Sequence, residues 1–401
     1  MKGTVVSPRV IIVCCLAALA VIFLAVPAPA APAGQGPERA IVVFRDSFAD
    51  APAQAGLLRA FGGEPLQSLW LINGVAAALP PGVAKHLLAR GEVVRIDPDV
   101  EVHALAKPPW AGGNKGQPPA QPPQELPWGV NRIDAEWAWG AATGAGVNVA
   151  VIDTGIDSSH PDLAANVAGG INFVAKTWWK PAAPSKWADD NGHGTHVAGI
   201  IAALDNDIGV AGVAPRATLW AVKVLDKNGS GYLSNVIAGI QWSVSNHIDV
   251  ANMSLGTDFD VPSLHDACDA AAAAGVLLVA AAGNDGAAVD YPGAYSSVIA
   301  VAATDINDLR PWWSSFGPQV YLAAPGVSVK STWKGGGYAY ASGTSMAAPH
   351  VTGTLALNLS ANLSASADDL SPAGWDVYTG WGLVDAGEAA TGAVNYGDDL
   401  P

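Results

Sequence analysis

Three side chains in separate segments of the sequence could together perform nucleophilic catalysis. Asp153 follows the apolar run VNVAVI, His193 lies in DDNGHGTHVAG, and Ser345 lies in SGTSMAAPHV. A serine hydroxyl is a weak nucleophile at neutral pH and needs a neighbouring base, which histidine supplies because its ordinary pKa is about 6.5. A buried aspartate then fixes the imidazole tautomer and stabilises the imidazolium. Each residue alone could be a cap or turn residue, but the combination predicts acyl-transfer chemistry.

The segment around Ser345 is also typical of a helix start, because short hydroxyl residues precede an apolar run. The two interpretations agree, since a helix N-terminus supplies N–H donors and a positive dipole end where an oxyanion would form. A further donor is expected from Asn284 in AAAGND, beside the backbone N–H of Ser345. His350 is too close in sequence to Ser345 to act as its base, and Pro349 should cost helix stability.

The segments that must position these residues alternate between strand-like and helix-like patterns. Strands are expected at Val147–Ile152, Ala217–Val224, Asp249–Met253, Val276–Ala281 and Val298–Val301, and helices at Thr195–Leu204, Leu233–Asn246 and Ser263–Ala274. Near-continuous apolar strands that alternate with helices predict a mostly parallel sheet covered on both faces, which is a three-layer α/β/α fold. Functional groups gather at the carboxyl ends of such strands, where Asp153 lies.

Residues 38–106 have a different pattern. Strand-like segments at 40–45, 69–79 and 93–105 are separated by helical segments at 51–61 and 83–90. This order predicts a small ferredoxin-like α+β unit. Residues 107–124, rich in Pro, Gly and Gln, are expected to be a linker to a second domain of residues 125–392, which a short tail of residues 393–401 follows.

The chain has 401 residues and a formal charge of −15. The charge argues against a nucleic-acid partner, which would need a basic face. Lys2 and Arg9 precede an apolar run and the cleavable stretch Ala28-Pro29-Ala30, so residues 1–33 are expected to be a secretory signal of an extracellular protein that has no membrane association after its removal. A retained membrane anchor is the alternative. Both Cys14 and Cys15 lie in the apolar run, which would leave Cys268 without a disulfide partner.

These segments resemble the subtilisin-like serine proteases, the subtilases of peptidase family S8, in the chain order Asp, His, Ser. The resemblance covers about residues 126–390 and includes SLG at 254–256 and YPGAYSSVIAVAATD from Tyr291. It implies a subtilisin-like fold and a monomeric serine endopeptidase that cleaves proteins and peptides through an acyl-enzyme intermediate. The implied triad is Asp153, His193 and Ser345, with Asn284 in the oxyanion hole.

The resemblance also implies a role for the N-terminal unit. Subtilases are often made with a propeptide that chaperones folding, inhibits the site and is then removed, so residues 38–106 resemble an intramolecular inhibitor of an autoprocessed zymogen. The strand EVHAL, residues 101–105, would lie in the active-site cleft, with cleavage near Leu105 or Ala106. The alternative is an ordinary accessory domain.

A structural calcium ion is the next implication, and it would suit an exported chain without disulfides, because a ligand that binds only the folded state stabilises it. By family correspondence the ion would be held by Gln124, Asp162, Leu204, Asn206, Ile208 and Val210. Oxygen ligands of carboxylate, amide and carbonyl type suit Ca²⁺. A polar turn without metal is the alternative. Asp189 and Asp190 could join a second metal site or be solvated.

The main specificity pocket is implied between two segments of small residues, Ser254-Leu255-Gly256 and Ala281-Ala282-Gly283. They leave room for a large apolar P1 side chain, the residue before the cut bond. At the implied pocket floor stands Asp290, with Asp285 nearby, and a carboxylate there would favour Lys or Arg at P1 unless it turns towards water. Broad specificity with large apolar P1 and tolerance of basic P1 is therefore expected.

Two features depart from the usual pattern of the subtilases, the long linker at 107–124 and an insertion between Asp153 and His193. The insertion at 173–187 carries three tryptophans, which could form a packed flap or an exposed binding surface.

The sequence disfavours three rival functions. A peptide-binding pseudoprotease would need a lost catalytic residue, and none is lost. An α/β-hydrolase esterase would need G-x-S-x-G, but the segment reads GTSMA. A structural module is disfavoured because the chain lacks repeats.

Overall fold

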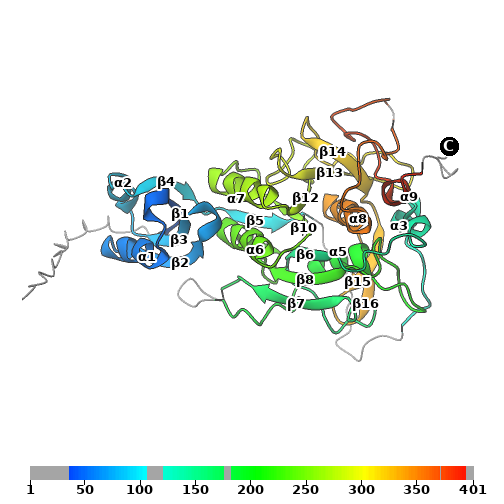
Figure 1. Ribbon diagram of the computed structural model, residues 1–401, viewed down its shortest axis with the longest axis horizontal. Helices are drawn as coiled ribbons and strands as arrows, with labels where there is room; N and C mark the ends of the chain where they lie inside the picture. The colour runs from blue at the N-terminus through cyan, green and yellow to red at the C-terminus, as the bar shows by residue number, and fades with distance from the viewer. Residues whose placement is uncertain (1–35, 106–120, 176–181, 371, 394–401) are drawn as a thin grey trace, which may run out of the picture.

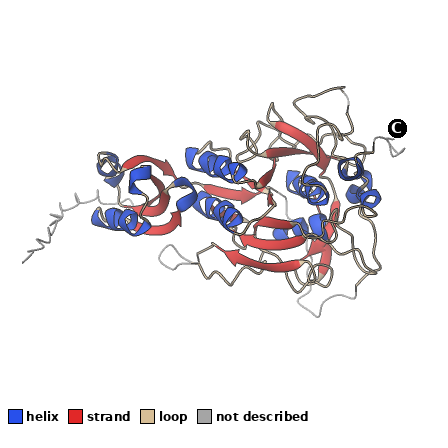
Figure 2. Cartoon of the chain, in the orientation of Figure 1, coloured by secondary structure: helices blue, strands red, loops and turns tan. Residues whose placement is uncertain are grey.

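The structure is a computed structural model that describes residues 36–105, 121–175, 182–370 and 372–393 (Figure 1). A small N-terminal unit lies at one end of the molecule, and the strand β5 (Glu101–Ala104) runs from it into a larger body (Figures 1 and 2). The predicted signal, most of the predicted linker and the predicted tail from residue 394 lie outside the described residues. Within the described ranges, no helix is long and apolar enough to cross a membrane.

The larger body is built on a seven-stranded sheet in the order β14-β13-β12-β10-β6-β8-β7. Every neighbouring pair in this sheet is parallel. The strands are β6 (Asn148–Asp153), β7 (Val167–Asn172), β8 (Thr218–Lys223), β10 (Val250–Met253), β12 (Leu277–Ala281), β13 (Ile299–Thr304) and β14 (Val320–Pro325). The predicted parallel sheet is confirmed, although the sequence analysis missed β7 and β14.

Both faces of this sheet are buried, which explains why its strands are apolar without alternation. Along β6, Val149 and Val151 belong to the hydrophobic cluster that contains helices α5 (His193–Ala202) and α8 (Thr344–Leu357). Ala150 and Ile152 belong to the cluster on the opposite face, with α6 (Leu233–Ser245) and α7 (Pro262–Ala273). Successive side chains of a strand point to opposite faces, so one short strand contributes to both clusters. The three-layer α/β/α arrangement is confirmed.

Smaller elements complete the larger body. They are the helices α3 (Trp128–Arg132), α4 (Ala135–Ala138) and α9 (Ala386–Thr391), the hairpin of β15 (Val329–Trp333) and β16 (Gly337–Ala341), and the short strands β9 (Ser230–Tyr232) and β11 (Leu255–Gly256). The hairpin packs against α5, whose Thr195 and His196 carbonyls accept hydrogen bonds from Thr332 and Ser331. Through this contact the hairpin braces the helix that carries His193.

The N-terminal unit has the ferredoxin-like arrangement. Its elements are β1 (Glu38–Phe44), α1 (Ala51–Ala60), β2 (Glu64–Leu69), β3 (Gly74–Leu79), α2 (Val83–Leu88) and β4 (Val93–Pro98), and its sheet has the order β2-β3-β1-β4. The expected single strand at 69–79 was wrong, because a 3₁₀ turn at Trp70–Ile72 separates β2 from β3. The expected strand at 93–105 is likewise divided, and its second part, β5, leaves the unit.

Two carboxylates attach the N-terminal unit to the larger body at the starts of α6 and α7. Asp99 accepts hydrogen bonds from the backbone N–H and the hydroxyl of Ser234, at 2.8 and 2.9 Å, and pairs with Arg39 at 2.7 Å. Asp97 accepts a 2.5 Å hydrogen bond from the hydroxyl of Ser263. Because the first N–H groups of a helix lack partners within the helix, Asp99 caps α6, and both carboxylates interact favourably with the dipoles of the helices at whose starts they lie.

Candidate active site

Asp153 and His193 meet where β6 ends and α5 begins. The Nδ1 atom of His193 lies 2.8 and 2.9 Å from the two carboxylate oxygens of Asp153, and both side chains are buried. The close approach of helix and strand requires glycine at position 194, because a Cβ atom there would lie 2.2 Å from the carbonyl oxygen of Gly155. The sequence GHG therefore delivers the imidazole directly onto the carboxylate.

The electrostatics of this pair make the imidazole more basic than an isolated histidine. Burial alone lowers the pKa of His193, but the charge and the hydrogen bond of Asp153, helped by the charge of Asp189, outweigh it and raise that pKa above its ordinary value. The Nε2 atom of His193 is buried and has no hydrogen-bond partner among the described residues. The pair is thus oriented through Nδ1, and Nε2 is left to take up a proton.

Asp189 is a residue whose role the sequence analysis missed. It was expected either to bind metal or to be solvated, but its two carboxylate oxygens accept five hydrogen bonds of 2.6 to 3.0 Å. The donors are the backbone N–H groups of Asn191, Gly192 and Thr195 and the hydroxyls of Thr154 and Thr195. These bonds tie the first turn of α5 to the end of β6. Asp190 also has a partner, since it pairs with the buried Lys223 at 2.6 Å.

Ser345 is the second residue of α8, and its side chain is fully buried. Its hydroxyl donates a 2.9 Å hydrogen bond to the carbonyl oxygen of Ser254, while the hydroxyl of Ser254 donates to the carbonyl oxygen of Ser345 at 2.8 Å. The expected hydrogen bond to His193 is therefore not formed in this structure, and the Ser345 hydroxyl would have to rotate to make it. The preceding Gly343 has φ 154°, a value that suits glycine at this turn.

Leu105, the residue after β5, lies between the predicted nucleophile and the predicted oxyanion donor. Its backbone N–H donates to the Ser254 carbonyl oxygen at 3.2 Å, which is the same oxygen that accepts the Ser345 hydroxyl. Its own carbonyl oxygen accepts a hydrogen bond from the side-chain amide of Asn284. The amide is oriented by Thr344, whose backbone N–H and hydroxyl donate to the Asn284 oxygen at 2.9 and 3.0 Å.

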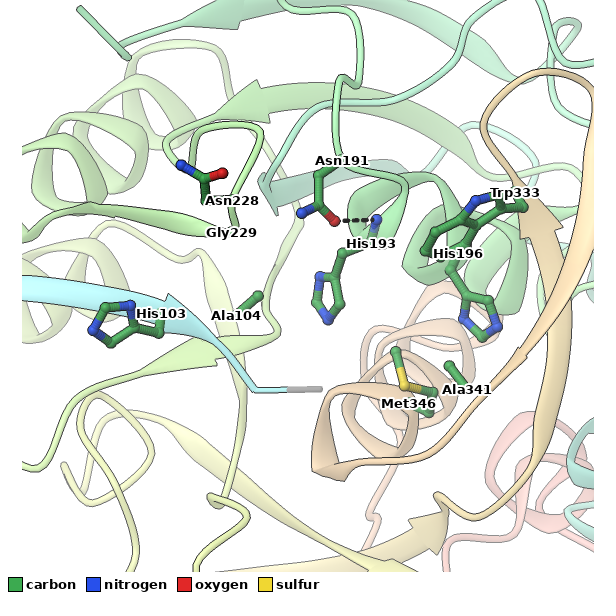
Figure 3. A pocket seen from close by; sticks show the side chains of 10 residues that line it. All are labelled: His103, Ala104, Asn191, His193, His196, Asn228, Gly229, Trp333, Ala341 and Met346. Carbon is green, nitrogen blue, oxygen red and sulfur yellow. Dashed lines mark hydrogen bonds between the residues drawn. The ribbon is translucent and has the colours of Figure 1, made fainter. Parts of the chain in front are cut away.

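The strand β5 fills the cleft in the manner of an extended peptide. It pairs antiparallel with β11 on one edge and with β9 on the other, which makes a three-stranded sheet. Beside it lies a cavity of 110 Å³ whose lining includes His103, Ala104, Asn191, His193, Trp333 and Met346 (Figure 3). In Figure 3 the ring of His193 lies between Ala104 of β5 and Met346 of α8.

The predicted pocket segments meet around the side chain of Leu105. A Cβ atom on Gly256 would lie 2.9 Å from Leu105 Cδ1 and 3.1 Å from Asp290 Cβ, and one on Gly283 would lie 2.8 Å from Asp290 Oδ2. The backbone N–H of Asp290 donates to the Ala282 carbonyl at 2.9 Å. Asp290 is only 9% exposed, so its side chain is not turned out into water. These residues, with Leu255 and Ser254 on β11 and its approach, form one pocket wall.

The six predicted calcium ligands form one hydrogen-bonded cluster. Asp162 accepts from the Asn206 side chain and from the Val210 backbone, both at 3.0 Å, and its own carbonyl accepts from the Leu204 backbone at 3.0 Å. The Gln124 side-chain oxygen accepts from the Asn206 backbone at 2.5 Å, and the Asn206 side-chain oxygen accepts from the Ile208 backbone at 2.7 Å. Gln124 therefore packs onto the loop, although its segment adjoins the predicted linker.

The chemistry of this cluster fits a hard cation. Burial raises the pKa of Asp162, against the hydrogen bonds from Val210, Asn206 and Tyr338 that lower it, and no cation contributes. A buried carboxylate with amide oxygens beside it is the kind of donor set that Ca²⁺ prefers. Among the described residues there is no group of three or more His, Cys, Asp or Glu side chains that could hold a metal, so a site here would depend on amide and carbonyl oxygens.

The one tryptophan of the insertion that the structure describes, Trp187, supports a packed flap rather than an exposed binding surface. Trp187 packs against the main hydrophobic cluster, and a Cβ atom on Gly170 would lie 2.7 Å from its ring. The other two tryptophans of the insertion lie in residues 176–181, outside the described residues. Cys268 is buried and forms no disulfide with any of the described residues.

Comparison with known proteins shows to which protein family the chain is related. The model of the Subtilase family matches residues 144–373. Subtilisin NAT of Bacillus subtilis subsp. natto is 43% identical over 305 residues, which are 75% of this chain and 74% of that protein. A thermostable alkaline protease of Halalkalibacterium halodurans is 51% identical over 236 residues, 58% of this chain and 63% of that protein. Subtilisin Savinase of Lederbergia lenta is 50% identical over 236 residues, 58% and 84% respectively. The chain therefore belongs to the subtilase family of serine endopeptidases.

Proposed function

We propose that this subtilase is a secreted endopeptidase, made as a zymogen, in which Asp153, His193 and Ser345 form the catalytic triad. One observation carries the proposal. Leu105 donates its N–H to the same carbonyl oxygen of Ser254 that accepts the Ser345 hydroxyl, while its carbonyl oxygen accepts from Asn284. A peptide bond held in this way has its carbonyl group beside a nucleophile and a donor.

The proposed reaction begins with a rotation of the Ser345 hydroxyl towards Nε2 of His193, the buried atom for which the described part of the chain offers no hydrogen-bond partner. The hydroxyl oxygen attacks the substrate carbonyl as Nε2 takes its proton, and Asp153 stabilises the imidazolium through Nδ1. The amide of Asn284 and the free backbone N–H of Ser345 at the start of α8 stabilise the oxyanion. His193 then gives the proton to the leaving amine, and water repeats the sequence on the acyl-enzyme.

We infer that the predicted propeptide ends at Leu105, so that residues 38–105 are removed by a cut after Leu105. In support, β5 pairs on both edges inside the cleft, and Asp99 and Asp97 accept hydrogen bonds from Ser234 and Ser263 at the starts of two helices of the larger body. A chain that has been cut after Leu105 would leave its new carboxyl end at the oxyanion donors and would inhibit as a bound product. Residues 1–33 are the proposed secretory signal, and the mature enzyme is proposed to act as a monomer.

We further propose that the cluster at Asp162 holds a structural calcium ion. The ligands would be Gln124, Asp162, Leu204, Asn206, Ile208 and Val210. The ion would supply the positive charge that the buried Asp162 carboxylate lacks, and its role would be stability rather than a step of the reaction. For specificity, the glycines of the pocket support large apolar P1 residues such as Leu105, and the position of Asp290 supports acceptance of Arg and Lys.

Expression of the full chain with Ser345→Ala tests the proposal against Ser342→Ala, a matched change three residues earlier. The Ser342 variant should process itself and hydrolyse casein, whereas the Ser345 variant should stay uncut, hydrolyse no casein and fail to react with a phosphonylating inhibitor. N-terminal sequencing of the active protein should give a start after Leu105. Proteolysis by the Ser345 variant would overturn the triad, and an active enzyme that keeps residues 38–105 attached would make the unit an accessory domain.

A further inference from the structure

We propose that the carboxyl group of Asp290 makes the choice of P1 residue depend on pH, with apolar side chains favoured when it is protonated and basic side chains favoured when it is ionised. The inference rests on the proposed function, because it takes Leu105 as the residue in the P1 position. It adds that the enzyme takes up a proton when it binds a substrate with an apolar P1 side chain and releases one when it binds a substrate with a basic P1 side chain.

The first step is geometric. A Cβ atom on Gly256 would touch both Leu105 Cδ1, at 2.9 Å, and Asp290 Cβ, at 3.1 Å, so the leucine side chain and the aspartate share the space beside that glycine. The Asp290 carboxylate is directed at Gly283, where a Cβ atom would lie 2.8 Å from Oδ2. The space is thus open only because positions 256 and 283 are glycine. Two polar side chains border it at Gly283, the hydroxyl of the buried Ser315, 2.7 Å from that Cβ position, and the carboxyl of Asp290, and only the carboxyl can carry a charge.

The second step is the charge around this carboxyl group. Burial, together with the charges of Asp285 and Asp258, raises the pKa of Asp290 to about 6. Asp258 follows β11 and Asp285 follows β12, so both strands that border the pocket bring acids towards it. Tyr291, the next residue, is neutral in this range because burial and Asp260 raise its pKa.

The sign of the effect follows from linkage. An apolar side chain in the pocket removes water from the carboxylate, so it raises the pKa and binds with proton uptake. Leu105 occupies this space in the structure, so the pKa of about 6 applies to the carboxyl group beside an apolar side chain. Binding of an apolar side chain is strongest below the pKa of the empty pocket and weakens as the pH rises towards about 6. A guanidinium or ammonium group favours the ionised carboxylate, lowers the pKa and binds with proton release. The preference for basic over apolar P1 must therefore increase with pH.

The same linkage applies to the propeptide. Leu105 is an apolar P1 residue, so its seating on Asp290 should be tightest in mildly acidic solution and weaker at alkaline pH. One carboxyl group would then set both how firmly the cut propeptide is held and which substrates replace it.

The test uses the enzyme obtained from the full chain and two acetyl-tetrapeptide p-nitroanilides that differ only in Phe or Arg at P1. The ratio of kcat/KM for Arg to that for Phe is measured from pH 5 to pH 9, and the titration of His193 cancels because both substrates share it. The ratio should rise by about ten-fold or more, the size of one charge-assisted hydrogen bond, with a midpoint near pH 6.

Asp290→Asn should make the ratio independent of pH, and the exposed Asp207→Asn should leave the curve unchanged. Asp285→Asn should move the midpoint to lower pH, because it removes a charge that raises the pKa of Asp290. This variant tests the Asp290 carboxyl group without altering it, and it replaces Asp290→Asn if that variant does not fold. A flat ratio in the unaltered enzyme, or a pH-dependent ratio that survives in Asp290→Asn, would overturn this inference alone. Failure of the enzyme to cleave either substrate would instead overturn the proposed function.

Discussion

Asp189 is a neighbour that positions His193, the proposed catalytic base, by contacts to the turn that carries it. Its five hydrogen bonds fix the turn that leads into α5, and its charge contributes to the raised pKa of His193. The side-chain oxygen of Asn191 also accepts from the His193 backbone at 3.0 Å (Figure 3). We regard Asp189 as a positioning residue for the imidazole.

This role predicts the effect of Asp189→Asn on the pH profile. Because the pKa of His193 is raised, the acid limb of kcat/KM should have its midpoint above the ordinary value for histidine, and loss of the Asp189 charge should move it to lower pH. Turnover should fall about ten- to a hundred-fold from misplacement of the base, with little change in KM.

The control for that experiment is Asp207→Asn, an exposed aspartate in the loop after α5, which should leave both the midpoint and the turnover unchanged. A fall in turnover without any movement of the acid limb would mean that Asp189 acts only through folding.

Among the elements, α6 and α7 are the two helices whose first turns depend on another part of the chain. Neither has a side-chain cap from its own N-cap residue, Tyr232 or Val261. From the N-terminal unit, Asp99 supplies the missing acceptor to the backbone N–H of Ser234 in α6, and Asp97 accepts from the hydroxyl of Ser263 in α7. The attachment therefore fixes how β4 and β5 are aligned with α6 and α7. A shift of one residue along these strands would move both carboxylates away from the starts of the two helices.

We expect Asp99→Ala to loosen this attachment. In the full chain with Ser345→Ala, which prevents processing, the free energy of unfolding from urea titration should fall by about 2–4 kcal/mol, because the change also leaves Arg39 without its buried partner. Asp99→Asn, which keeps a neutral acceptor, should lose less. Asp46→Ala, in a second 3₁₀ turn at Asp46–Phe48 where Asp46 is exposed, should change stability by less than about 0.5 kcal/mol, and an equal loss there would refute the cap.

The strands and helices that could be predicted are those that are buried on both faces or have a clear helical period. The strands that were not predicted lack a continuous apolar run. Residues 167–172, with the sequence VAGGIN, contain two glycines, and 64–69, with the sequence EPLQSL, alternates poorly. They are strands because neighbours pair with them, which local sequence does not reveal. The roles of Asp97, Asp99 and Asp189 escaped prediction for the same reason, since each depends on a partner far along the chain or on turn geometry.

For the molecule as a whole, stability without a disulfide is expected to depend on the cluster at Asp162. Removal of calcium from the Ser345→Ala chain with a chelator should lower the free energy of unfolding by about 2.7 kcal/mol relative to a free calcium concentration about a hundred times the Kd. Asp162→Asn should abolish the dependence on calcium, measured as the shift of the thermal midpoint with added Ca²⁺.

Asp207→Asn is the matched control in the same loop, because its side chain is exposed and outside the cluster. It should keep the full response to calcium. A response that survives in Asp162→Asn would place the ion elsewhere.

The pairing of β5 on both edges has a consequence for what the enzyme can digest. A segment that forms ladders with β9 and β11 at once has given up every backbone partner that it had in its own protein. About five consecutive residues must therefore be released from any helix or sheet before they fit. The rate at which a folded protein is cut will report how often that stretch unfolds, so the enzyme will act first on frayed termini, long loops and denatured chains and will spare compact domains, including its own.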